Sequence, residues 1–143
     1  MTVELQDLAL AVKRLQHRHH RTLDARLAPL GTTLVQWDAL RAISRHSGAS
    51  SHRLAQLTFQ TDQSFGTLAG RLLARGLIDR IAGPGRAIRH RLTPSGKALL
   101  SEGYTVFNEV LSQSFSTLTP TELDTLYGLL THLLHGPGEP LAE

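Results

Sequence analysis

The chain has 143 residues, a length that fits one domain with a real hydrophobic core but leaves no room for a separate cofactor lobe. It contains no cysteine, which excludes disulfides, thiolate zinc sites, iron–sulfur clusters and thiol-based sensing. The net charge is +3, but residues 41–97 hold ten Lys or Arg against two Asp, whereas residues 98–143 hold six acidic groups and no Lys or Arg. This basic middle segment predicts a surface that binds a polyanion, with a solvated basic face as the alternative.

The N-terminal segment predicts one long amphipathic helix. Apolar residues recur at spacings of three and four from Leu5 to Leu27, and Pro29 and Gly31 end the pattern. Charged residues interrupt the first apolar positions, unlike the continuous apolar run of a signal peptide or a membrane span. We therefore expect a cytoplasmic protein.

Three shorter helices are predicted next. The first runs from about residue 34 to residue 45, with Trp37, Leu40 and Ile43 facing inward. Ser51 is the expected N-cap of the second, a short helix. Thr61 is the expected N-cap of the third, which Gly76 closes.

The segment DRIAGPGRAIRHRLTP, residues 79–94, predicts a β-hairpin. Two arms with alternating apolar residues, 77–81 and 87–92, flank a Gly-Pro-Gly turn. A lone hairpin buries too little surface to be a fold of its own. It therefore has to be an appendage, and it carries the basic side chains of Arg86, Arg89, His90 and Arg91.

Two further helices follow the hairpin. Thr93 and Pro94 begin the first, and Thr119 with Glu122 forms a capping box at the start of the second. The predicted fold class is mainly α with a small β-hairpin (α+β). The terminal helices carry more apolar surface than one domain can cover, which predicts burial against a second copy. This surface includes Leu5, Leu8, Val12, Val106, Val110, Leu111, Phe115, Leu126, Leu129, Leu130, Leu133 and Leu134.

Two short helices with a tight connection, followed by a basic hairpin, form a winged helix-turn-helix. Four phrases in this order resemble the MarR family of bacterial transcriptional regulators over nearly the whole chain: LAPLGTTLVQWDALRAI, LAQLTFQTDQSFGTLAGRLLARGLIDR, LTPSGKALL and LTPTELDTLYGLLTHLL. The resemblance implies a single domain over residues 1–143, with a DNA-binding module at 34–97 and dimerisation helices at 1–33 and 98–143. It also implies a homodimer on pseudo-palindromic double-stranded DNA and a small-molecule effector bound between the lobes.

The outward face of the helix after Thr61 is predicted to read DNA. Its other face is an apolar stripe of Phe65, Leu68, Ala69 and Leu72. Amide, hydroxyl and guanidinium side chains on the outward face suit adenine edges, bases and phosphates. The expected DNA-binding residues of this helix are Gln63, Ser64, Gly66, Thr67 and Arg71.

Two glycines on the same outward face, Gly66 and Gly70, each cost the helix about 1 kcal/mol relative to alanine. Their i, i+4 spacing suits a backbone that comes close to DNA, and a weak surface helix is the alternative. Asp62 is not expected to contact DNA, because a carboxylate repels phosphate. Family members often have an arginine about where Thr67 stands, so the resemblance implies base readout that is less centred on guanine.

The hairpin is expected to be the wing. The resemblance implies an arginine at its tip that enters the minor groove, and Arg86 matches this arginine. The tip is shorter than in the family, and it lacks the aspartate that commonly precedes the arginine. Arg89 and Arg91 are expected to support the wing near phosphates.

The effector crevice that the resemblance implies is expected to be lined by His20, Arg21, Trp37 and Arg41. Stacking and cationic groups of this kind suit a small anionic or aromatic ligand, and a core position for Trp37 is the alternative. No cofactor is expected. Histidines at 17, 20, 132 and 135 could in principle close a metal site, although solvated surface histidines are the commoner outcome.

Catalytic motifs are missing from the sequence: it has no Gly-x-Ser-x-Gly, no phosphate-binding loop and no His-Glu-x-x-His. The acidic residues are dispersed, so we do not expect an enzyme. The predicted function is that of a sequence-specific DNA-binding transcriptional regulator, a repressor relieved by a small-molecule effector. The alternative is a dimeric ligand- or metal-binding sensor that does not bind DNA.

Overall fold

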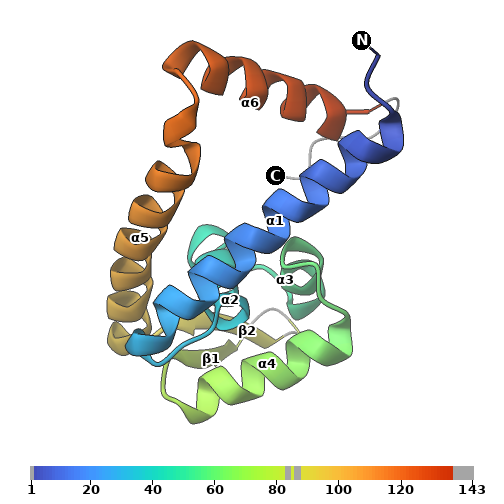
Figure 1. Ribbon diagram of the computed structural model, residues 1–143. Coiled ribbons are helices and arrows are strands. Elements are labelled where there is room, and N and C mark those ends of the chain that lie inside the picture. Colours follow the sequence, from blue (N-terminus) through green and yellow to red (C-terminus); the bar gives the residue numbers. More distant parts are fainter. Residues whose placement is uncertain (1, 83–84, 86–87, 137–143) are drawn as a thin grey trace.

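The computed structural model describes residues 2–82, 85 and 88–136, which form helices and one two-stranded hairpin (Figure 1). The order of elements is the predicted one, and the fold is mainly α as expected. In chain order the elements are α1 (Leu5–Leu27), α2 (Leu34–Arg45), α3 (Ser51–Leu57), α4 (Asp62–Ala74), β1 (Ile78–Ala82), β2 (Ile88–Leu92), α5 (Pro94–Ser114) and α6 (Pro120–Leu134). Short 3₁₀ turns follow α1 at Ala28–Leu30 and α5 at Phe115–Thr117.

Local hydrogen bonds begin most helices at the predicted residues. The Thr61 hydroxyl accepts from the N–H of Ser64 at 3.0 Å, and Thr119 forms the expected reciprocal capping box with Glu122. The start of α3 was predicted one residue too late. Ser50 is its N-cap, because the Ser50 hydroxyl accepts from the N–H of Arg53 at 3.1 Å.

Trp37 packs α2 against α5 in the hydrophobic core. This side chain is fully buried, its ring stacks on Phe107 with centroids 4.2 Å apart, and its Nε1 donates to the Leu100 carbonyl at 3.2 Å. Gly103 makes room for the indole, since an added Cβ would lie 1.8 Å from Trp37 Nε1. The predicted inward positions Leu40 and Ile43 are also buried.

The hairpin pairs β1 with β2 in antiparallel register, from Ile78 opposite Leu92 to Ala82 opposite Ile88. Ile78, His90 and Leu92 are buried and attach it to the helices. Helix α5 begins directly against the start of the hairpin, where an added Cβ at Gly96 would lie 2.1 Å from the Leu77 carbonyl oxygen. The hairpin is therefore fixed at its base.

The terminal helices form an open frame in which α6 lies at the top, away from the hairpin, while α5 runs down to the level of the hairpin (Figure 1). Helices α1 and α5 pack on each other, whereas α6 has no buried residue in the described part of the chain. Val110, expected to face a second copy, is buried in the chain's own core instead. The large apolar side chains left exposed on α1 and α6 are Leu5, Leu8, Leu10, Val12, Tyr127, Leu129, Leu130, Leu133 and Leu134. Over the described residues, no helix has both the length and the hydropathy needed to cross a bilayer.

Candidate nucleic-acid interface

Helix α4 presents two faces of opposite character. Phe65, Leu68, Ala69 and Leu72 are buried against the core, which confirms the predicted inward stripe. The helix packs on α3, and a turn over residues 58–61 joins the two. The predicted DNA-reading residues all lie on the exposed face: Gln63, Ser64, Gly66, Thr67 and Arg71.

The exposed face of α4 continues onto neighbouring elements. Gln63, Thr67 and Arg71 border one shallow hollow together with Gln60 from the turn and Val35 from the start of α2. An amide, a hydroxyl and a guanidinium therefore point to the same surface, as contacts to base edges and phosphates require. Sequence reasoning missed Gln60, because its place beside α4 depends on how the turn folds.

Within residues 2–82, 85 and 88–136, the glycines of α4 have no packing role. A Cβ added at Gly66 or at Gly70 would meet no heavy atom within 4 Å. Both positions are helical and exposed, so alanine would fit and would favour the helix. The open space above both residues lies on the face that carries Gln63 and Thr67.

Asp62, in the first turn of α4, contacts a histidine that the sequence did not single out. His52 Nδ1 lies 2.8 Å and 3.1 Å from the two carboxylate oxygens of Asp62, and both side chains are exposed. The pair joins α3 to the start of α4. No spacing rule connects residues ten positions apart in different helices, so this contact could not be predicted.

The predicted DNA-binding residues of the wing differ in their exposure and in their partners. Arg91 lies opposite Asp79, with Nε 3.9 Å from a carboxylate oxygen, and both side chains are exposed, so the ion pair is weak. Arg89 is half-buried on the same face of the hairpin as Arg91. Arg86, the predicted minor-groove residue, lies outside the described residues.

His90 connects the wing to α3. It is buried on β2, with Nε2 3.4 Å from the Ser51 hydroxyl, while Nδ1 has no hydrogen-bond partner in the described structure. Burial, and then the charge of Arg80 on the paired strand, lower the pKa of His90 below its usual 6.5. The surroundings of this anchor therefore favour the neutral form of the imidazole.

A second site, here called the lobe recess, is an open concavity of about 380 Å³ bordered by α1, α2, α5, the turn after α5 and α6. Of the predicted effector residues, His20 and Arg41 line it. Trp37 lies behind the wall with no exposed surface, which matches the core alternative for this residue. Side chains not anticipated for the recess are His19, Asp38, Phe107 and Phe115.

The lobe recess is lined by aromatic rings and by an ion pair between Arg41 and Asp38. Arg41 Nη2 donates to Asp38 at 2.8 Å, and its guanidinium lies 5.1 Å from the Trp37 centroid and 5.4 Å from that of Phe107. Burial raises the pKa of Asp38, an effect opposed by Arg41 and His20. The i, i+3 spacing of Asp38 and Arg41 on α2 could have indicated the pair.

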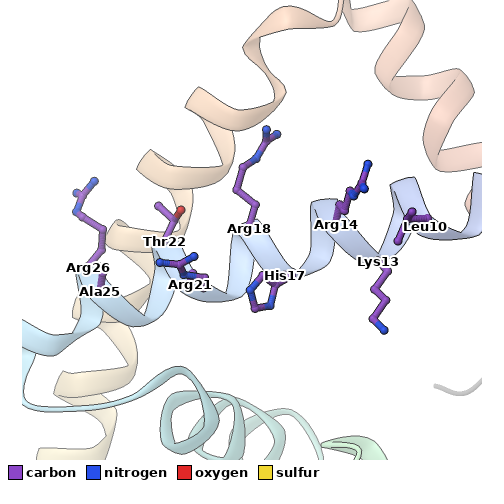
Figure 2. Close-up of a pocket in the computed structure, with 9 residues that line it drawn as sticks. All are labelled: Leu10, Lys13, Arg14, His17, Arg18, Arg21, Thr22, Ala25 and Arg26. Atoms are coloured by element: carbon purple, nitrogen blue, oxygen red, sulfur yellow. The ribbon is translucent and has the colours of Figure 1, made fainter. Parts of the chain in front are cut away.

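Arg21 does not line the lobe recess. It borders a larger hollow of about 770 Å³ whose lining residues all belong to α1 (Figure 2). Figure 2 shows Arg14 and Arg18 on one side of the helix and Lys13 and His17 on the other. Among the described residues, no three His, Asp or Glu side chains form a metal-binding group, so the four histidines considered above are not brought together in one chain.

Comparisons with known proteins bear on this architecture. A model of the MarR family matches residues 30–87, which span α2 to the hairpin. The HTH-type transcriptional repressor Rv2887 of Mycobacterium tuberculosis is 32% identical over 99 residues, which cover 68% of this chain and 71% of that protein. The chain belongs to the MarR family.

Solved MarR-family structures have the same fold. A probable transcriptional regulator from Pseudomonas aeruginosa matches with a TM-score of 0.77 and 30% identity, over 91% of this chain and 99% of that one. Rv2887 in complex with salicylic acid matches with a TM-score of 0.73 and 28% identity, over 88% and 95%. A mutant MarR from E. coli complexed with operator DNA has a TM-score of 0.82 and covers 90% and 94%, and at 21% identity it shows the fold alone.

Proposed function

We propose that this MarR-family chain is a dimeric transcriptional repressor that binds a pseudo-palindromic double-stranded DNA site and is released by a small aromatic anion. The α4 face reads bases, the wing holds phosphates, and no catalytic group takes part. A regulator of this kind acts in the cytoplasm, where bacterial DNA lies. The open face of α4 carries the proposal: it holds Gln63, Thr67 and Arg71 side by side, with two glycines that no packing contact among the described residues requires.

A second copy of the chain completes the molecule in this proposal. Helices α1 and α6 leave a set of large apolar side chains exposed, with Leu133 and Leu134 each 70% exposed. Large apolar side chains exposed in such numbers on two helices favour burial against a partner. A twofold dimer places two copies of α4 on half-sites about one helical turn apart, as helix-turn-helix dimers require.

The lobe recess is the proposed effector site. Its aromatic walls suit a planar ring, and Arg41 and His20 suit an acidic group. Rv2887 has been crystallised with salicylic acid and with p-aminosalicylic acid, ligands of this class. Because Arg41 lies against Trp37, the single tryptophan of the chain, its fluorescence should report binding.

Release from DNA follows from the position of the recess. Arg41 belongs to α2 in the DNA-binding module, while His19 and His20 belong to α1 in the terminal lobe. A ligand held between them favours one angle between module and lobe, and so one spacing of the two α4 helices. If that spacing mismatches the operator, DNA affinity falls by the ratio of the ligand's affinities for the two states.

An electrophoretic mobility shift with the DNA upstream of the protein's own coding sequence tests the proposal. We expect a specific complex that resists random competitor duplex and dissociates when millimolar salicylate is added, together with a saturable change in Trp37 fluorescence. A ligand-dependent fluorescence change without any DNA complex would instead support the sensor that does not bind DNA. A DNA complex that is indifferent to salicylate would contradict the effector assignment alone.

A further inference from the structure

The turn between α3 and α4 holds a phenylalanine where the backbone favours glycine. The N–H of Phe59 donates to the Gln56 carbonyl at 3.2 Å, and the N–H of Gln60 donates to the Ala55 carbonyl at 2.8 Å. These two bonds form a Schellman motif, in which the residue at the position of Phe59 is usually glycine. Phe59 has φ of +58°, the left-handed region that is unfavourable for a residue with a side chain.

Burial in the core does not offset the backbone strain at Phe59. Its side chain is 96% exposed, so it contributes almost no hydrophobic stabilisation. Glycine would make the same turn with less strain and without an exposed aromatic ring. Strained residues of this kind persist at sites where they contact a ligand.

A concave surface beside the Phe59 ring, here called the turn recess, lies between α2 and α3 and has a volume of about 400 Å³. It is lined by Arg45, His46, Arg53 and Phe59, and by the Asp38–Arg41 pair. Within the described part of the chain, neither Arg45 nor Arg53 makes an ion pair. The turn recess therefore brings Phe59 together with two arginines that have no ion pair in the described part of the chain, beside the Asp38–Arg41 pair that also lines it. Its size suits a small molecule.

The turn recess is separate from the DNA-reading face. Gln63 and Arg71 of α4 share their hollow with Val35, at the start of α2, whereas the turn recess is bordered by Arg45 at the end of that helix. Phe59 is among the residues that line the turn recess and is not among those that line the hollow beside α4. A contact of Phe59 with bases is therefore not what the geometry favours.

We propose that the turn recess binds a planar aromatic anion, with Phe59 stacking on the ring and with Arg45 and Arg53 pairing with the acidic group. The site adds a second point of ligand control to the proposed repressor and rests on that function. The Asp38–Arg41 pair borders both the turn recess and the lobe recess, so that occupancy of one is coupled to the other through a shared guanidinium. Phe59 also lies in the turn that positions α4, which links the ligand to the recognition helix.

The test is a salicylate titration of the full-length protein followed by backbone amide NMR. In the wild type we expect two groups of saturable shifts, one around residues 53–60 and one around His19 and His20. Phe59→Gly and Arg53→Gln should each weaken binding at the turn recess about tenfold, the loss expected from one stacking or charged contact, and leave the other group in place. Phe59→Gly should also raise Tm, because glycine relieves the left-handed strain, so weaker binding cannot be attributed to misfolding.

Two control ligands test whether binding needs both the aromatic ring and the charge. Benzyl alcohol, which has the ring without the charge, and acetate, which has the charge without the ring, should both fail to saturate the shifts around residues 53–60. Saturation by acetate would reduce the site to a general anion patch and overturn the proposal. It would also be overturned if salicylate shifted these amides equally in wild type and Phe59→Gly, or failed to saturate them at all.

Operator binding by the Phe59→Gly variant distinguishes failure of the turn recess from failure of the proposed function. Phe59→Gly without ligand should bind operator DNA as the wild type does. A loss of DNA binding in this variant would make Phe59 a DNA-binding residue and contradict the ligand site. Normal DNA binding and normal shifts at His19 and His20, with none around residues 53–60, would refute the turn recess while the repressor function stands.

Discussion

The winged module and the terminal helices differ in how completely each buries its own apolar side chains. Within the module, α2, α3, α4 and the hairpin enclose Leu40, Phe65, Leu72 and Ile78 almost entirely. In the terminal helices, α6 buries no residue in the described structure and α1 leaves its first two turns exposed. The module thus closes its own core, whereas the terminal helices leave apolar side chains uncovered for the proposed dimer.

The largest effect is expected from charging the exposed apolar face of α6. The double substitution Leu129→Glu, Leu133→Glu places two carboxylates where the dimer should bury leucine. Light scattering should then give the mass of one chain where the wild type gives two. Operator affinity should fall by on the order of a hundredfold, because the two half-sites are no longer bound by one linked molecule.

The control for that experiment is Ser44→Glu, which adds a carboxylate on the exposed side of α2. It should leave the dimer intact. A wild-type protein that is monomeric at micromolar concentration would remove the basis of the half-site argument.

A second substitution tests the junction of the two regions. Gly103→Ala puts a Cβ within 1.8 Å of Trp37 Nε1, so the indole or α5 has to move. We expect a loss of about 1–3 kcal/mol in the free energy of unfolding, typical of overpacking. Urea unfolding monitored by Trp37 fluorescence measures it, and an unchanged midpoint would mean that α2 and α5 are loosely joined.

Gly66→Ala, on the exposed face of α4, should act in the opposite direction. No atom opposes the new Cβ, so the helix should gain about 1 kcal/mol of stability. Operator affinity should fall, because the methyl group separates the α4 backbone from DNA. Unfolding and mobility-shift measurements on one preparation check both effects; tighter or equal DNA binding would mean that Gly66 marks only a weak surface helix.

The smallest effect is expected in the pH dependence of stability, through His90 at the base of the wing. Since the pKa of His90 is lowered in the folded state, the unfolded chain takes up a proton more readily. Stability should therefore be unaffected well above pH 6.5 and should decrease as the pH falls from 6.5 toward the folded pKa. The measurement is the unfolding free energy of wild type minus that of His90→Leu across this range, in which the similar contribution of His19 cancels.

Structural features set by residues close together in the sequence could be predicted, whereas features set by contacts between distant residues could not. Caps such as Thr61, Thr93 and Thr119 were found because each bonds to an N–H three residues away. The burial of Trp37 was left open, because it is decided by Phe107, seventy positions further along the chain. Phe59 escaped attention because left-handed turns are recognised by glycine, and here the signal residue is missing.

The same distinction applies to the candidate sites. The periodicity of α4 was enough to separate Gln63 and Thr67 from the buried stripe, since a helix fixes its faces locally. The lobe recess draws on α1, α2, α5 and α6, so only His20 and Arg41 of its lining were anticipated, and Arg21 borders a different hollow on α1. A site built from four separate elements depends on packing angles that no local pattern contains.

The central claim is that the exposed face of α4 reads DNA, with Arg71 on a phosphate and Gln63 on a base edge. The most direct test is a salt titration of operator and random DNA with wild type, Arg71→Ala, Gln63→Ala and the charge-matched control Arg14→Ala on α1. Arg71→Ala should weaken binding to both DNAs and reduce the slope of log affinity against log salt by about 0.9, the value for one phosphate contact. Gln63→Ala should keep the slope and lose about 1–3 kcal/mol of preference for the operator, and Arg14→Ala should change neither. Slopes and preferences that are the same in all four proteins would show that α4 does not face DNA.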